Sequence, residues 1–268
     1  MFANIALGRY YPVESSIHNL DPRTKIFAVF IYMTGLFIVS SPLGYGAYVM
    51  LAMVTIALAK IPLVVMIRSL KPLWFIVVFT MTLHFFVTPG KVALQIWLFS
   101  ITYEGLRFGI FMGLRLVLLI TFTSLLTLTT TPINLTDGLE KILRPFSKVG
   151  VPAHELAMMM TIALRFIPTL AEELGKIMQA QMARGADFQS GNLLRRAKNL
   201  VPLLVPLFIS SFRRADELAL AMEARCYRGG ENRTRMYELK MHVGDFIAYG
   251  LLVIMFVATI TLHIMVNF

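Results

Sequence analysis

Two short triplets with an arginine at their centre are the residues in this sequence best suited to chemistry. The first is Ala183-Arg184-Gly185 and the second, 41 positions later, is Ala224-Arg225-Cys226. Small residues flank each arginine, and a guanidinium can bind a carboxylate through two parallel hydrogen bonds. The pattern therefore predicts two helix tips, each able to enter a cleft and bind an acidic group of a partner protein.

The segments before the two triplets resemble each other. Each has a proline, then an acidic pair, then an apolar run into Ala-Arg; the residues are Pro168, Glu172 and Glu173 in the first, and Pro202, Pro206, Asp216 and Glu217 in the second. A single arginine in a last helical turn would be ordinary, because a cation there complements the helix dipole by about 0.3–1 kcal/mol. Gly185 could likewise be an ordinary C-cap glycine. The recurrence of the pattern favours the partner-binding interpretation.

The composition is that of an integral membrane protein. Hydrophobic residues make up 57% of the 268 residues, charged residues only 15%, and the mean hydropathy is +0.71. Soluble domains have about 45–50% apolar and about 25% charged residues. The net charge of +10 suits acidic lipid headgroups or an acidic protein partner. Nucleic acid is not expected as a partner, because few basic clusters alternate with aromatic residues.

Residues 1–131 are expected to form an N-terminal membrane region with four spans. Residues 26–59 carry no charge, and the turn residues at 40–46 divide this run into two helices. Asp21 before Pro22 is typical of an N-cap with proline in the first turn. Arg115 lies inside the fourth span, where we expect its side chain to snorkel to the near interface. The expected spans are residues 26–40, 43–59, 72–88 and 106–130.

Residues 132–242 are expected to form a cytosolic helical region. They hold 16 of the 25 basic and 11 of the 15 acidic residues. We predict a long helix to about Arg184, then a helical pair over residues 193–225 interrupted near Pro202 and Pro206. Residues 243–268 follow as a fifth span, with 23 uncharged residues after Asp245. The fold class is thus an all-α membrane protein with about five transmembrane helices and long cytosolic helices.

The distribution of basic residues predicts the orientation. Basic residues precede the first span, follow the second and fill residues 132–242, so these segments should be cytosolic. The N-terminus is then cytosolic and the C-terminus external, in a multi-pass protein of the cell membrane.

Residues for catalysis are not apparent in the sequence. It has no glycine-rich phosphate loop ending in Lys-Ser/Thr, and its five histidines have no metal-ligand spacing. We therefore expect no catalytic residue, no metal and no cofactor in this chain. A self-contained secondary transporter would need polar or broken spans, and a membrane-bound enzyme would need convergent acids or histidines. Both remain alternatives.

The chain resembles the transmembrane coupling subunit, or T component, of energy-coupling-factor transporters, a family that includes the cobalt-transport permease. The resemblance rests on residues 20–25 (Leu-Asp-Pro-Arg-Thr-Lys), the two arginine triplets, and the order of four spans, a helical region and a last span. It covers essentially the whole chain. The second triplet departs from the family's Ala-Arg-Gly at Cys226.

The resemblance implies a four-part importer of a vitamin or metal ion. Two cytosolic ATP-binding-cassette ATPases would bind ATP and receive the two triplets, Ala183-Arg184-Gly185 and Ala224-Arg225-Cys226. A small membrane subunit would bind the substrate, so the substrate cannot be read from this chain. Membrane lipid would surround the spans. Apolar residues of the long helices would bind the substrate-binding subunit: Met159, Ala163, Phe166, Ile167, Leu204 and Phe208.

Overall fold

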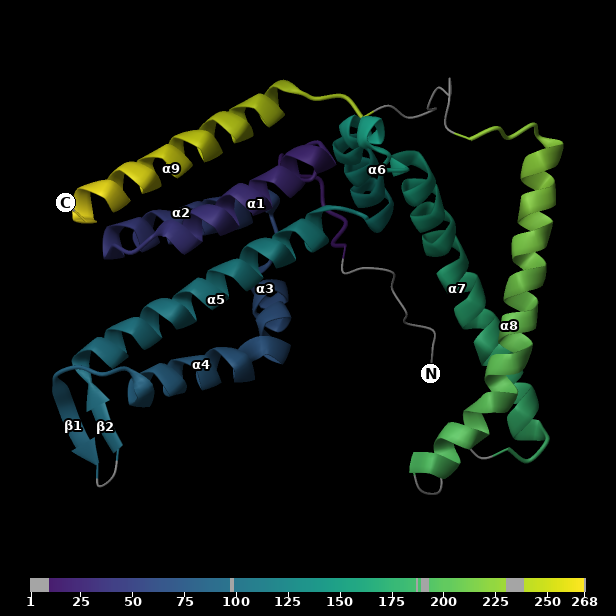
Figure 1. Ribbon diagram of the computed structural model, residues 1–268, viewed down its shortest axis with the longest axis horizontal. Helices are drawn as coiled ribbons and strands as arrows, with labels where there is room; N and C mark the ends of the chain where they lie inside the picture. The colour runs from purple at the N-terminus through teal and green to yellow at the C-terminus, as the bar shows by residue number, and fades with distance from the viewer. Residues whose placement is uncertain (1–9, 97–98, 187, 189–192, 230–238, 268) are drawn as a thin grey trace. The chain divides into compact units, whose positions relative to one another are not determined.

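The computed structural model describes residues 10–96, 99–186, 188, 193–229 and 239–267 of the chain (Figure 1). They form two compact units. We call residues 8–138 together with 239–268 the membrane unit, and residues 139–238 the arm unit. The units divide between residues 138 and 139 and between 238 and 239. The sequence-based boundaries at 131/132 and 242/243 stay predictions.

The membrane unit is mainly helical. In chain order it contains α1 (Pro22–Ile38), α2 (Pro42–Ala59), α3 (Leu63–Leu70), the 3-10 turn η1 (Lys71–Leu73), α4 (Trp74–Val87), β1 (Val92–Ile96), β2 (Phe99–Thr102), α5 (Tyr103–Thr129), the start of α6 (Pro132–Leu143) and α9 (Val243–Asn267). The arm unit contains the end of α6, the 3-10 turn η2 (Arg144–Val149), α7 (Ala153–Ala183) and α8 (Leu193–Ala224).

Apolar helices long enough to cross a membrane confirm the fold class. Among the described residues, four segments have that length and composition: Pro42–Ala59, Leu63–Val87, Tyr103–Thr129 and Val243–Met265. The remaining expected span is the first in the chain, residues 26–40, and it corresponds to α1, whose 17 residues lie at the lower limit for crossing the hydrocarbon layer. The antiparallel pair β1–β2 was not predicted.

Local signals explain how the first two helices begin. The Asp21 side chain accepts a hydrogen bond of 2.9 Å from the backbone N–H of Arg23, with Pro22 in the first turn. Ser41 caps α2 in the same way, accepting from the N–H of Gly44 at 3.2 Å. The predicted N-cap and the predicted break between the two helices are confirmed, because both depend on residues within one turn of the boundary.

The core of the membrane unit lies among α1, α2 and α5. The rings of Tyr32 and Phe122 stack with their centroids 3.8 Å apart, and the Tyr32 hydroxyl donates to the Tyr48 carbonyl at 3.2 Å. The Tyr48 hydroxyl in turn hydrogen-bonds Thr259 of α9 at 3.2 Å. Burying tyrosine hydroxyls requires partners of this kind, and here the partners connect three helices.

Arg115 has a protein partner inside the membrane unit. Its guanidinium donates to the carbonyl of Val39, the C-cap of α1, at 3.1 Å. It also lies over the rings of Phe37 and Tyr45, with 5.6 and 5.8 Å between Cζ and the ring centroids. A cation at a helix C-terminus complements its carbonyls, so the charge stabilises the end of α1. Snorkelling alone was an incomplete prediction, because the sequence does not show which helix end lies beside Arg115.

A glycine stripe that the sequence analysis missed brings α4 and α5 together. Gly105, Gly109 and Gly113 recur every four residues on one face of α5. A Cβ at Gly109 would lie 2.5 Å from the ring of Phe85 and 3.0 Å from the Met81 carbonyl oxygen. Small residues at this spacing allow two membrane helices to approach closely. The spacing is readable in the sequence and could have predicted this contact.

We expect Gly109→Leu to destabilise the membrane unit by about 1–3 kcal/mol or more, because the new side chain overlaps α4. Gly46→Leu is the matched control, since a Cβ at Gly46 would meet nothing within 4 Å. The midpoint of thermal unfolding in detergent measures both. Equal midpoints for the two variants would show that the close approach of α4 and α5 is unimportant.

Candidate functional site

The arm unit is built on two long helices that contact each other. The Arg214 guanidinium of α8 forms an ion pair with Glu173 of α7 at 2.9 Å, and the Gln181 side chain donates to the Pro202 carbonyl at 3.4 Å. Because higher numbers on α7 pair with lower numbers on α8, the helices run antiparallel. A hydrogen bond from Ser210 and then the nearby Arg214 lower the pKa of Glu173, so this carboxylate is charged at neutral pH.

The predicted interruption of residues 193–225 is wrong, because α8 is one helix of 32 residues that passes through Pro202 and Pro206. Proline has no N–H, so Pro206 leaves the carbonyl four residues earlier without its helical partner. That carbonyl belongs to Pro202 and accepts from Gln181 instead. Figure 1 shows that α8 bends in its first half rather than breaking.

The first triplet forms the C-terminus of α7. Arg184 is the C-cap, and Gly185 has φ +86°, in the left-handed region that glycine adopts without strain. The N–H of Gly185 donates to the Met182 carbonyl at 2.9 Å, and the N–H of Ala186 donates to the Gln181 carbonyl at 3.0 Å. This pair of bonds defines a Schellman motif.

The second triplet forms the C-terminus of α8 in the same way. The N–H of Cys226 donates to the Glu223 carbonyl at 2.8 Å, and the N–H of Tyr227 donates to the Met222 carbonyl at 3.0 Å. Arg225 directly follows the last helical residue, as Arg184 does in α7. Cys226 takes the left-handed position with φ +57°. The repeat seen in the sequence is therefore a repeat of backbone geometry.

Both arginines are exposed, together with the small residues Ala183, Gly185, Ala224 and Cys226. Figure 1 shows the C-terminal ends of α7 and α8 at opposite ends of the pair. Gln181 of α7 and Pro202 of α8 lie side by side. Arg184 comes three residues after Gln181 on α7, and Arg225 comes 23 residues after Pro202 on α8, in the opposite direction. At about 1.5 Å per helical residue, roughly 40 Å separates the two arginines. They can bind two separate partner surfaces but not one small ligand.

A non-glycine residue in the left-handed region costs about 1–2 kcal/mol. We therefore expect Cys226→Gly to stabilise the last turn of α8 by about 1 kcal/mol, whereas Ala219→Gly inside the same helix should destabilise it by about the same amount. Amide hydrogen exchange at Cys226 and Tyr227 measures the change. Faster exchange in Cys226→Gly would contradict the role assigned to position 226.

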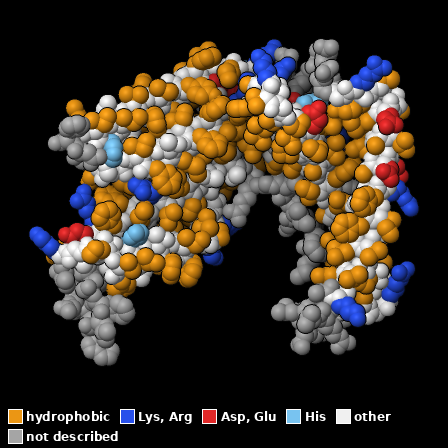
Figure 2. Space-filling view, viewed as in Figure 1, with side chains coloured by type: hydrophobic (Ala, Val, Ile, Leu, Met, Phe, Trp, Pro, Cys, Tyr) orange, Lys and Arg blue, Asp and Glu red, His pale blue; other side chains and the backbone are white. Residues whose placement is uncertain are grey.

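Apolar side chains are exposed on both long helices. Met159 and Ile167 of α7 are 55% and 41% exposed, and Leu204 and Phe208 of α8 are 47% and 61% exposed. Ala163 is also exposed, one turn from Met159, whereas Phe166 is half-buried. Hydrophobic side chains cover much of the visible surface of α8 (Figure 2). Single exposed apolar residues are normal on a protein surface, but several on the same helices suit contact with a protein or with lipid.

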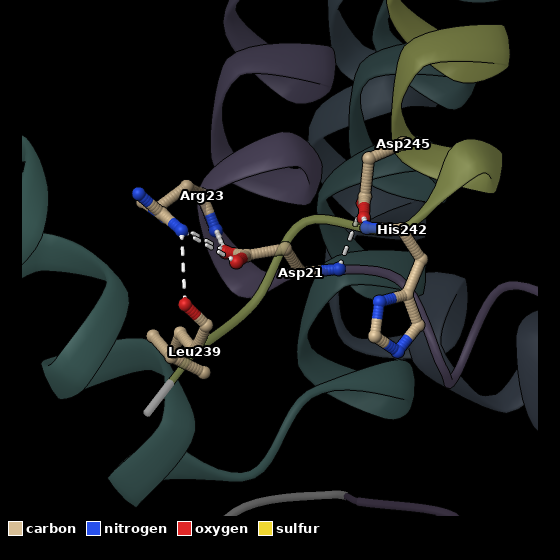
Figure 3. Close-up of polar contacts among 5 residues, drawn as sticks. All are labelled: Asp21, Arg23, Leu239, His242 and Asp245. Atoms are coloured by element: carbon tan, nitrogen blue, oxygen red, sulfur yellow. Dashed lines mark hydrogen bonds and ion pairs between the residues drawn. The ribbon is translucent and has the colours of Figure 1, made fainter. Parts of the chain in front are cut away.

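A polar cluster at the start of α1 and α9 was not predicted (Figure 3). The Asp245 carboxylate accepts from the backbone N–H groups of Asp21 at 2.9 Å and His242 at 2.7 Å. Asp21 also pairs with Arg23 at 2.8 Å, and Arg23 donates to the Leu239 carbonyl at 3.4 Å. The cluster joins the beginning of the first helix to the beginning of the last. The sequence showed Asp245 as the last charge before a span but not its partner.

Helices able to cross a membrane, with a separate unit of long charged and apolar helices, define an integral membrane protein. Residues 13–236 match the family described as Cobalt transport protein. Two curated proteins named energy-coupling factor transporter transmembrane protein EcfT are similar over nearly the whole chain. The one from Acidaminococcus fermentans is 60% identical over 258 residues, covering 96% of both chains. The one from Bacillus subtilis is 49% identical over 240 residues, covering 89% of this chain and 91% of that one.

The chain therefore belongs to the cobalt transport protein family, as a transmembrane T component of energy-coupling factor transporters. The resemblance inferred from the sequence is confirmed. The chain is a membrane component of a transporter complex.

Proposed function

We propose that this chain couples two cytosolic ATP-binding-cassette ATPases to a small membrane subunit that binds a vitamin or metal ion for import. The observation that carries the proposal is the repeated helix end. Arg184 and Arg225 occupy equivalent positions of two Schellman motifs, exposed, beside a small residue, and far apart on one pair of helices. Each arginine pairs with a carboxylate in a groove of one ATPase.

The exposed apolar side chains of the arm unit bind the substrate-binding subunit. Met159, Ala163 and Ile167 recur every four residues on α7, and Leu204 and Phe208 do so on α8. Side chains at this spacing form a stripe on one helix face, which suits a partner helix. Phe166, next to Ile167 in the sequence, is half-buried and adds its remaining exposed surface to this partner site.

The antiparallel pair of helices transmits movement between the partners. The ion pair between Glu173 and Arg214 and the bond from Gln181 to Pro202 hold α7 and α8 together. When ATP binding moves the two ATPases relative to each other, the arginines at the two ends transfer this movement to the helices. The apolar stripes then transfer it to the substrate-binding subunit.

This chain itself hydrolyses no ATP and binds no cofactor, because the ATPases bind the nucleotide. The purified chain alone should hydrolyse no ATP and should take up no substrate in proteoliposomes. A tagged chain should bring down ATPase subunits from solubilised membranes. Substrate uptake by the chain alone would overturn the proposal in favour of a secondary transporter.

The arm unit and the N-terminus lie in the cytosol, and the C-terminus lies outside. Cys226 is exposed on the arm unit. Gly46 is also exposed, and it lies near the turn where α1 ends and α2 begins. We expect a membrane-impermeant maleimide to label Cys226 only after the cytosolic face is opened. In the Cys226→Gly background, Gly46→Cys should be labelled from outside in intact cells. Labelling of both positions from the same face would contradict this topology.

A further inference from the structure

A partly open apolar cavity of about 310 Å³ lies within the membrane unit, among α1, α2, α5 and α9. Its walls include Val29, Leu58, Leu125 and Leu251. This volume is at the lower end of the range of about 300–1,000 Å³ that is typical of small-molecule sites. The proposed function uses none of these residues.

One end of the cavity is polar. Lys25, Thr24 and Thr129 lie there, at the end of the unit where α1 and α9 begin and α5 ends. The Lys25 ammonium donates to the carbonyls of His18 and Thr129, both at 3.0 Å, which leaves one of its three N–H donors. The Thr24 side chain is fully buried, and its hydroxyl has no hydrogen-bond partner among the described residues. A ligand oxygen at this end would meet two donors.

The other end of the cavity is apolar and reaches into the membrane. Leu252 lies nine residues into α9, and Leu51 lies eight residues before the end of α2. At about 1.5 Å per residue, the cavity extends roughly 12 Å from the polar end. The hydrocarbon core of a bilayer is about 30 Å thick, so this depth is close to that of one leaflet. Polarity and depth together match a lipid acyl chain below its ester group.

We propose that this cavity binds one acyl chain of a membrane phospholipid. The acyl chain of the lipid lies between α2 and α9, and the ester oxygen of the lipid accepts a hydrogen bond from Lys25 or Thr24. The carboxylates of Asp21 and Asp245 together offset the charges of Arg23 and Lys25. The site therefore has no excess positive charge that would favour an anionic headgroup. The bound lipid fills the space between the last helix and the first helical hairpin.

Photo-crosslinking in phosphatidylcholine vesicles tests the proposal with the full chain. The probe is phosphatidylcholine with a diazirine near the end of one acyl chain. Adducts mapped by mass spectrometry should concentrate on residues 51–58 and 244–252, well above the level at the exposed residues Phe75 and Phe79 of α4. Equal labelling of the cavity and of α4 would overturn the proposal, because it would indicate ordinary contact with bulk lipid.

Two variants close the cavity from different walls. Ala28 of α1 and Ala248 of α9 are half-buried and line it, so Ala28→Phe and Ala248→Phe should each reduce its labelling to the level of α4. Ala258→Phe is the matched control, exposed on α9 outside the cavity. Excess labelling that persists in both cavity variants would overturn the proposal. The protein should also be labelled in native membranes together with its partner subunits. Loss of the excess cavity labelling there would overturn the proposal, because a protein segment would then occupy the cavity.

Discussion

Replacing both Arg184 and Arg225 with alanine is expected to abolish association with the ATPases and ATP-driven uptake, while the chain stays folded and inserted. Each arginine side chain is exposed, and the bonds that end α7 and α8 are backbone bonds. Alanine at these positions therefore preserves both Schellman motifs. Any large loss must come from the interaction with a partner.

The magnitude separates two explanations of the arginines. If they only complement the helix dipole, each replacement should cost about 0.3–1 kcal/mol of local stability and leave uptake intact. If each binds a buried carboxylate, truncation leaves that acid unpaired and costs about 2–5 kcal/mol of binding. A loss of 2–5 kcal/mol corresponds to a decrease in affinity of about 30-fold or more.

The single variants and a matched control complete the experiment. Arg184→Ala or Arg225→Ala alone should weaken the complex and slow uptake, because one contact remains. Lysine should rescue poorly, since it cannot form the two parallel hydrogen bonds. Arg213→Ala is the control, because Arg213 is exposed within α8 and away from its end. Pull-down of the ATPases and substrate uptake are measured for each; wild-type uptake in the double variant would leave only the helix-dipole role.

Features that depend on neighbouring residues could be predicted from the sequence. The cap formed by Asp21 before Pro22, the break at Ser41 and the end of α7 after Ala183 all arise within one helical turn. The repeated Ala-Arg-small pattern also became a repeated geometry, because a C-terminal motif needs a small residue at the left-handed position. Cys226 shows that this position tolerates a residue other than glycine.

Features that depend on distant partners could not be predicted. Two prolines indicated a break in α8, but Gln181 of another helix binds the carbonyl that Pro206 leaves free. Arg115 was assigned to the interface, but it caps α1, 76 residues earlier in the chain. Of the six apolar residues predicted to bind a partner, five are exposed and Phe166 is half-buried. Which protein covers them stays a prediction, because a single chain does not contain its partner.

Removing the Asp245 carboxylate is the second change with a large expected effect. Asp245 is 1% exposed and is in the first turn of α9, where its Oδ2 accepts from the backbone N–H of His242. An acid that reaches back to the residue before its helix forms half of a capping box. Its Oδ1 accepts from the N–H of Asp21, which precedes α1. One carboxylate thus starts the last helix and fixes it to the first.

We expect Asp245→Ala to lower the free energy of unfolding of the membrane unit by about 2–6 kcal/mol, because two N–H groups lose their acceptor at about 1–3 kcal/mol each. Asp245→Asn should have an intermediate effect, since the amide keeps one acceptor oxygen. His242→Ala is the control, because His242 contributes its backbone N–H to this bond and its side chain is exposed. Thermal unfolding in detergent ranks the variants. If Asp245→Ala and His242→Ala unfold at the same temperature, the carboxylate does not hold the first and last helices together.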